Sequence, residues 1–353
     1  MNISKSKCYV NSRTLYHYFV SIYGIFYYLI RRSSSERVYQ SMVYIHSNSN
    51  GRSTFILNKI VNFIEYLKFN KVAVYHQDGT NYILNEPNYI NKNLVKNIII
   101  NSYACDKNKL NSLFIRKIIE SEKLFTGKLL LIDDSYVENQ TLSQSRGYSN
   151  PVRLNYYSDS ILEKSREIQL IAKSSYFLKI AESFLGVAPY LDSVTAWRSF
   201  PLSKGLSPSS KGAQLYHYDL DRLSWLKIFI YITDVDENSG PHLYVEGSHI
   251  AENKRSIILK RGYVRVDDME IESIYGKDKI KRALGKAGTI LYGNTMAFHK
   301  GESPRDSERL ILELQYTANN YGAQPIKIKN RDLCEQIFHS DSNDVNSWSF
   351  DLL

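Results

Sequence analysis

The second half of the sequence consists mostly of short segments with the composition of β-strands. Seven of them lie between residues 190 and 317: Tyr190 to Phe200, Leu215 to Asp219, Trp225 to Val235, His242 to Val245, Tyr263 to Ile274, Gly288 to Tyr292 and Arg309 to Thr317. Turn residues such as Gly240-Pro241 and Gly293-Asn294 separate them. Several short strands with regular turns are typical of a sandwich or barrel. We therefore expect a mainly β fold here.

Helical spacing of apolar residues predicts helices that flank these strands. Residues 51–69 form one such segment, with Ser53 as its N-cap, and a long helix or helix pair is expected from Ser158 to Leu185, closed by Gly186. A Ser/Asn/Gly-rich loop at 139–157 is the best candidate boundary. We predict a basic, mixed α/β N-terminal region of unknown role at 1–150, a β domain at 151–325 and a C-terminal tail at 326–353.

The net positive charge comes from the first 150 residues. Residues 1–150 hold 19 Lys/Arg and 10 Asp/Glu, whereas residues 151–353 hold 26 of each, so the first half carries the whole formal charge of +9. Such an excess can attract an acidic partner or a membrane surface. No nucleic-acid-binding motif accompanies it, so we interpret it as a solvated basic surface and expect no nucleic-acid partner.

Two features bear on the cellular compartment. The three cysteines, Cys8, Cys105 and Cys334, have no disulfide-framework or zinc spacing, which fits a reducing cytosol and predicts a cytoplasmic protein. The apolar segment from Leu15 to Ile30 is about sixteen residues long, short of the roughly 20 that a spanning helix needs. We expect no transmembrane span and favour a packed core helix. Organellar targeting and a membrane-associated N-terminus stay open as alternatives.

A His-x-Asp motif, His217 and Asp219, lies on one of the predicted strands. Residues i and i+2 of a strand point to the same face, so the imidazole and the carboxylate would lie side by side. Together they make two of the three ligands in the facial triad that holds non-haem Fe(II). The motif alone is weak, because histidines are often structural.

Two downstream residues would complete a site around this motif. His299 follows about eighty residues later, and Arg309 opens the next strand. The planar fork of an arginine matches the carboxylate of an α-keto acid and stays charged. His242 and His249 lie in a turn-rich segment with no arginine at a suitable distance. We therefore favour His299 as the distal ligand.

With these residues in place, the sequence resembles the phytanoyl-CoA dioxygenase family of Fe(II)/2-oxoglutarate oxygenases. The resemblance runs from about Ser174 to Thr317 and rests on the helix ending at Gly186, QLYHYD at 214–219, LKIFIYITDVDENSGPHLYVEGSH at 226–249, GNTMAFHKG at 293–301 and RLILELQY at 309–316. Glu246 departs from the family, which usually has proline there. Residues 1–150 show no such resemblance.

The resemblance implies a double-stranded β-helix (jelly-roll) core with flanking helices over residues 151–325. It also implies iron ligands at His217, Asp219 and His299, and 2-oxoglutarate held by Arg309. The expected reaction uses Fe(II), 2-oxoglutarate and O₂ to hydroxylate a small organic substrate, with release of succinate and CO₂. Related halogenases replace the carboxylate ligand with Ala or Gly, so Asp219 favours hydroxylation or desaturation.

Further pocket residues follow from strand alternation. On residues 225–233 the aliphatic face is expected to pack against helices, which turns Lys227 and Tyr231 towards 2-oxoglutarate or substrate. A position of Lys227 that reaches solvent stays open as an alternative. Gln214 is a candidate hydrogen-bond partner of the cosubstrate or substrate, and a surface role at the end of the strand stays open. Alternation allows only one of Trp197 and Arg198 to point inward, and Trp197 is our candidate for the pocket.

Two other classes of function stay open at this point. One is a catalytically silent jelly-roll binding protein, against which the intact triad argues. The other is a cupin-type metalloenzyme that does not use 2-oxoglutarate; such sites usually gather more histidines and have no need of Arg309. Neither the substrate nor the oligomeric state is readable from the sequence.

Overall fold

The computed structural model describes residues 12–31, 33–69, 83–85, 92–158, 161–202, 206–250 and 255–323; the predicted tail at 326–353 lies outside them. The helices are α1 (Ser12–Arg31), α2 (Glu36–Asn48), α3 (Arg52–Phe69), α4 (Lys92–Asn101), α5 (Ser112–Glu122), α6 (Leu142–Arg146), α7 (Ile161–Lys164), α8 (Arg166–Ala172), α9 (Ser175–Leu185), α10 (Arg255–Leu259) and α11 (Asp268–Tyr275). The strands are β1 (Tyr103–Lys109), β2 (Gly127–Leu131), β3 (Tyr136–Gln140), β4 (Val152–Tyr157), β5 (Tyr190–Ser199), β6 (Trp225–Tyr231), β7 (His242–Val245), β8 (Ile280–Ala283), β9 (Thr289–Gly293), β10 (His299–Gly301) and β11 (Arg309–Thr317).

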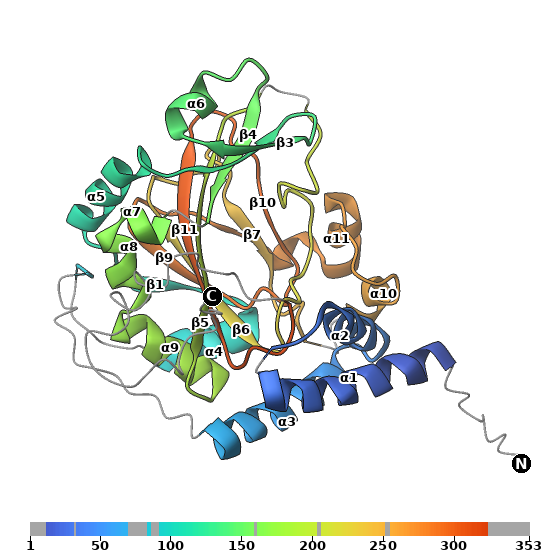
Figure 1. Cartoon of the computed structure of the whole chain (residues 1–353). Helices are drawn as coiled ribbons and strands as arrows, with labels where there is room; N and C mark the ends of the chain where they lie inside the picture. The colour runs from blue at the N-terminus through green and yellow to red at the C-terminus, as the bar shows by residue number, and fades with distance from the viewer. Residues whose placement is uncertain are drawn as a thin grey trace, which may run out of the picture.

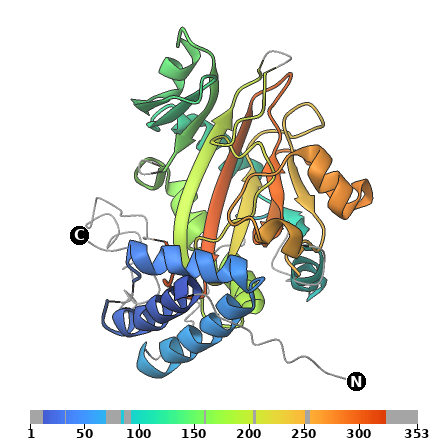
Figure 2. The same ribbon diagram turned by 90° about the vertical axis from the view of Figure 1, so that its right-hand side faces the viewer.

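The strands form two antiparallel sheets. The larger has the order β1-β9-β6-β11-β5-β4-β2-β3, and the smaller has the order β10-β7-β8 (Figure 1). Side chains of β6, β9 and β11 pack against side chains of β7 and β8, so the two sheets enclose an inner core. Helices flank this pair of sheets (Figures 1 and 2). The arrangement confirms the predicted mainly β fold with a jelly-roll core.

A second core fills the space between the large sheet and its helices. The aliphatic face of β6, which includes Leu226, Ile228 and Ile230, packs here with Phe177 and Ile180 of α9. Alternation along a strand sends the neighbouring side chains to the opposite face, which is the inner one. This confirms the predicted facing of residues 225–233.

Strands from both sides of residue 150 belong to the large sheet. β1 pairs with β9, and β2 pairs with β4, with Leu129 and Leu130 fully buried. The boundary predicted near residue 150 therefore falls between neighbouring strands of one sheet. The helices α1, α2 and α3 share a third core with the segment around the His-x-Asp motif, including Tyr216 and Tyr218.

Two predicted strands have a different structure. Residues 268–275 form the helix α11, because the side chain of Asp267 accepts a hydrogen bond from the Glu270 N–H at 2.8 Å and caps the helix. Residues 215–219 form no regular strand. Instead, Tyr216 and His217 make single-residue bridges to Val266 and His299.

The N-terminal apolar segment is the helix α1, and it is only partly packed. One face buries Val20, Gly24 and Tyr28, while Phe19 and Phe26 on the other face are 72% and 62% exposed. The expectation of a packed core helix is therefore wrong for the outward half of α1. Among the described helices, none has the length and apolarity needed to cross a membrane.

Candidate metal centre

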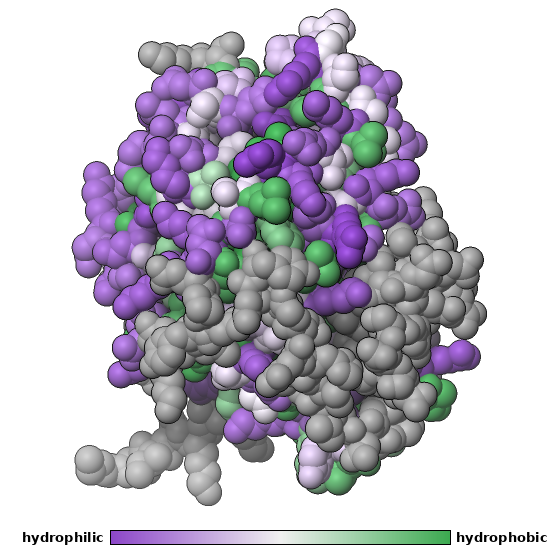
Figure 3. All heavy atoms as spheres, turned by 90° about the vertical axis from the view of Figure 1, so that its left-hand side faces the viewer, coloured by the Kyte–Doolittle hydropathy of each residue, from purple (hydrophilic) through white to green (hydrophobic). Residues whose placement is uncertain are grey.

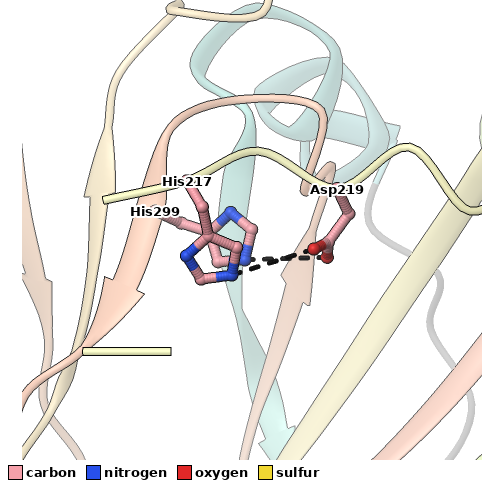
Figure 4. A group of neighbouring side chains, drawn as sticks. All are labelled: His217, Asp219 and His299. Carbon is pink, nitrogen blue, oxygen red and sulfur yellow. Dashed lines mark ion pairs between the residues drawn. The ribbon is translucent and has the colours of Figure 1, made fainter. Parts of the chain in front are cut away.

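Three side chains with metal-binding atoms converge at one point between the two sheets: His217, Asp219 and His299 (Figure 4). Their ligand atoms all lie within 4.8 Å of one another. The Nε2 atom of His217 is 3.8 Å from Oδ1 of Asp219, and the Nε2 atom of His299 is 3.7 Å from Oδ2. All three residues are buried. The structure thus brings together the three residues that we predicted as metal ligands.

Backbone pairing holds the two histidines together although they lie far apart in the sequence. The His217 N–H donates to the His299 carbonyl at 3.0 Å, and the His299 N–H donates back to the His217 carbonyl at 2.8 Å. In such a pair the two side chains lie on the same face. The Asp219 N–H donates to the Thr295 carbonyl at 2.8 Å and continues this pairing.

Both imidazoles are held in the tautomer that leaves Nε2 free to bind a metal. Nδ1 of His217 donates to the Leu215 carbonyl at 2.9 Å, and Nδ1 of His299 donates to the Ala297 carbonyl at 3.0 Å. A carbonyl only accepts, so each Nδ1 carries the proton and each Nε2 keeps its lone pair. Burial lowers the pKa of both histidines, and the neighbouring His299 lowers that of His217 further. The rings are therefore neutral near pH 7.

A lysine accompanies the carboxylate ligand. Nζ of Lys227 lies 3.0 Å from Oδ2 of Asp219 and 3.5 Å from Oε1 of Glu313. Burial alone would raise the pKa of Asp219, but the charge of Lys227 brings it below its ordinary value. Asp219 is thus ionised. Two neutral imidazoles and one carboxylate form the donor set of a facial triad, which suits Fe(II).

The triad opens into a cavity of about 500 Å³. Its walls come from the strands β2 to β6 and from β11 of the large sheet, and from β10 and its neighbours on the opposite side. A cavity of this size accommodates a small organic molecule beside a metal.

Arg309 lines this cavity and has unused donors. The side chain is buried, and its Nη2 donates to Oγ of Ser199 at 3.3 Å. Nε and Nη1 are buried and have no hydrogen-bond partner among the described residues. Burial lowers the pKa of Arg309 to about 10. A buried guanidinium with free donors is costly unless an anion compensates it. This position therefore fits the carboxylate of an α-keto acid.

The other two predicted cosubstrate ligands line the cavity but already have partners. Lys227 contacts Asp219 and Glu313. Oε1 of Gln214 accepts hydrogen bonds from Nη1 of Arg153 at 3.1 Å and from the Ser209 N–H at 2.8 Å. Both residues thus support the site from its wall.

The two predicted pocket aromatics differ in depth. Trp197 lines the cavity, while the adjacent Arg198 points away and pairs with the buried Glu122. Tyr231 points inward as predicted, but it lies outside the cavity lining. It is fully buried, and its hydroxyl donates to the Ala283 carbonyl at 2.7 Å. The prediction for Tyr231 needs this correction because strand alternation fixes the side of a residue and leaves its depth open.

Sequence reasoning missed Glu313, which faces the cavity from β11 and pairs with Lys227. The spacing in the sequence could have predicted it. Residues four apart on a strand point to the same face, and Glu313 is four residues after Arg309. Thr195 was also missed. It lies opposite Glu313 on the neighbouring strand β5 and lines the cavity.

Fold and site together define the class of protein: a jelly-roll protein with a centre of two histidines and one carboxylate. No family model and no curated protein matches the chain. Among solved structures it is similar to HygX from Streptomyces hygroscopicus with nickel and 2-oxoglutarate bound, at 14% identity and a TM-score of 0.47, covering 74% of this chain and 96% of HygX.

Two further solved structures show similar values. The non-heme alpha ketoglutarate dependent epimerase SnoN from nogalamycin biosynthesis has 15% identity and a TM-score of 0.41, covering 64% of this chain and 81% of SnoN. EvdO2 from Micromonospora carbonacea var. aurantiaca, complexed with 2-oxoglutarate, has 14% identity and a TM-score of 0.44, covering 65% and 91%. We assign the site in this chain from its own geometry.

Proposed function

We propose that this protein is an Fe(II)/2-oxoglutarate-dependent oxygenase that hydroxylates a small organic substrate, and that it is related to the phytanoyl-CoA dioxygenase family. One observation carries the proposal. The buried triad of His217, Asp219 and His299 shares a cavity with Arg309, whose Nε and Nη1 have no partner among the described residues. A metal ion would bind the triad, and a carboxylate would accept hydrogen bonds from the free donors of Arg309.

Each residue has a defined task in this proposal. The Nε2 atoms of His217 and His299 and a carboxylate oxygen of Asp219 would hold the metal at the cavity. Arg309 binds the far carboxylate of 2-oxoglutarate and fixes its orientation. Lys227 keeps Asp219 ionised. When bound, iron and 2-oxoglutarate supply, with O₂, the oxidising chemistry that yields a hydroxylated product, succinate and CO₂.

The site favours this reaction over the alternatives. Asp219 fills the third ligand position, which disfavours halogenation. A cupin-type enzyme without 2-oxoglutarate would have no use for the unpaired donors of the buried Arg309. A silent binding protein would not need two imidazoles held in the metal-binding tautomer.

Formation of succinate from 2-oxoglutarate tests the proposal. Purified protein with Fe(II) and O₂ should produce succinate, and candidate metabolite classes that are substrates should increase the rate, as followed by mass spectrometry. Asp219→Ala should abolish this turnover because the metal loses a ligand, and Arg309→Ala should reduce it sharply. Unchanged turnover in both variants would refute the proposal.

A further inference from the structure

The helices α1 and α3 carry a large share of the exposed apolar side chains. Seven of these side chains lie on α1 (Leu15, Tyr16, Phe19, Ile22, Tyr23, Phe26 and Ile30) and six lie on α3 (Phe55, Ile56, Ile60, Phe63, Tyr66 and Leu67). We call these thirteen side chains the apolar helix face. On the side of the molecule drawn in Figure 3, the hydrophobic residues instead form small groups among hydrophilic ones. A contiguous exposed apolar surface marks an interaction site.

The two helices lie side by side. The hydroxyl of Tyr18 on α1 is 2.6 Å from Oγ of Ser53 at the start of α3, and the hydroxyl of Tyr28 donates to Glu65 near the end of α3 at 2.5 Å. The earlier residue of α1 contacts the start of α3 and the later residue contacts its end, so the two helices run in the same direction. They lie along the lower edge of the molecule in Figures 1 and 2.

Both helices rest on the same short segment, residues 319–321. The hydroxyl of Tyr321 donates to the carbonyl of Ser21 on α1 at 2.8 Å. The side-chain amide of Asn319 donates to Asn58 and Asn62 on α3 at 3.0 and 2.6 Å. The buried side of α1 is formed by Val20, Gly24 and Tyr28, and that of α3 by Leu57, Val61 and Glu65. The apolar residues named above are exposed, so the apolar helix face points away from these buried sides.

The chain segment that forms this surface is rich in positive charge. Residues 1–69 contain nine Lys/Arg and two Asp/Glu, so they carry +7 of the formal net charge of +9. One of the two acidic residues, Glu65, is buried and accepts hydrogen bonds from Tyr28 and Tyr190. Arg52 and Lys59 are exposed among the apolar residues of α3, and Nζ of Lys59 lies 4.6 Å above the ring of Phe55.

We propose that the apolar helix face docks on the surface of an anionic lipid bilayer. Aromatic and aliphatic side chains would enter the boundary between headgroups and acyl chains, while the Lys/Arg residues contact lipid phosphates. A second copy of this chain fits the surface less well, because residues 1–69 carry +7 in each copy and the two basic segments would repel one another. The inference is independent of the catalytic proposal.

Docking in this way leaves the active-site cavity open to water. The cavity is lined by Lys128 and Leu130 of β2 and by Tyr136 of β3. These strands lie at the end of the molecule opposite to α1 and α3 (Figure 1). The protein would thus work at the membrane surface on a substrate that reaches it from the aqueous side.

Co-sedimentation with vesicles tests the proposal. The full chain should bind vesicles of phosphatidylcholine with phosphatidylserine, and binding should weaken with added salt and with phosphatidylcholine alone. Phe19→Ser/Phe26→Ser should weaken binding by at least about tenfold, since it removes two inserted rings. Arg52→Gln/Lys59→Gln should also weaken it by about tenfold, since each cation near the surface contributes.

Matched controls keep the test specific. Ile257→Ser/Met269→Ser alters two side chains on α10 and α11 that are 57% and 81% exposed, and it should bind like the wild type. Lys277→Gln/Lys286→Gln, at exposed lysines elsewhere, should do the same. Circular dichroism checks the fold of each variant. Folded wild-type protein that ignores anionic vesicles would overturn the proposal. So would a dimer in light scattering that Phe19→Ser/Phe26→Ser dissociates, because a second copy would then be the occupant.

Discussion

At the scale of single residues, the charge balance around Asp219 is the main feature of the site. Lys227 contacts both Asp219 and Glu313, and all three side chains are largely buried. Burial opposes the ammonium group, but the nearby carboxylates raise the pKa of Lys227 well above its ordinary value. Lys227 therefore stays charged and compensates two carboxylates before any metal is bound.

Replacing this lysine should destabilise the metal-free protein. Lys227→Met would leave Asp219 and Glu313 buried without a cation, at a cost of about 3 kcal/mol in the free energy of unfolding. A divalent metal would compensate part of that charge, so Mn(II) should raise the melting temperature of the variant more than that of the wild type. Thermal unfolding with and without Mn(II) measures both effects. An equal response to Mn(II) would show that Lys227 does not compensate Asp219.

The three candidate ligands could be predicted from the sequence, whereas the residues around them could only partly be predicted. His217 and Asp219 are two residues apart, so local geometry places them together. His299 and Arg309 lie far along the chain; their residue types and order favoured them, and the family resemblance supported that choice. Tyr231 shows what strand alternation cannot predict. Alternation gives the face to which a side chain points, whereas its distance from the cavity depends on packing with other strands.

At the scale of elements, part of the predicted strand at residues 263–274 is a helix with a side-chain N-cap. The segment from Tyr263 to Ile274 was predicted as a strand, but Asp267 caps the helix α11 within it. Predicted strands with strong β composition and flanking turns, such as β5 and β11, were found at nearly the right bounds. The short strands β8 and β10 were missed, because segments of three or four residues give almost no periodic signal.

The cap of α11 can be tested directly. Asp267→Ala should lower the free energy of unfolding by about 1 kcal/mol, because the N–H of Glu270 loses its acceptor. Asp267→Asn is the matched control and should keep most of that stability, since asparagine caps as well as aspartate. Urea unfolding measures the difference. Equal stability of the wild type and Asp267→Ala would contradict the assignment of the cap.

At the scale of the whole molecule, the N-terminal half contributes strands to the large sheet. β1 adds to β9 at one edge of the large sheet, and β2 and β3 add beyond β4. Ile98, Phe114 and Ile118 belong to the core that also contains the aliphatic face of β6. Sequence reasoning did not predict this, because strand pairing between distant segments depends on tertiary contacts that local patterns do not encode.

A chain that starts at residue 151 should therefore fail to fold. It would lack β1, β2 and β3, expose the unpaired edges of β9 and β4, and remove part of the core. We expect it to be insoluble or to show no cooperative thermal transition, in contrast to the full chain. Solubility and circular dichroism measure this. A soluble product with a cooperative transition would show that residues 151–353 fold without the first half.

Calorimetric titration of 2-oxoglutarate into anaerobic protein tests the central claim most directly. With Mn(II) present, the wild type should bind one equivalent of 2-oxoglutarate, because metal and Arg309 together hold it. Arg309→Ala should still bind Mn(II) but lose most of its affinity for 2-oxoglutarate, and Asp219→Ala should lose Mn(II) binding. Wild-type protein that binds 2-oxoglutarate equally well without metal, or an Arg309→Ala variant with unchanged affinity, would contradict the account.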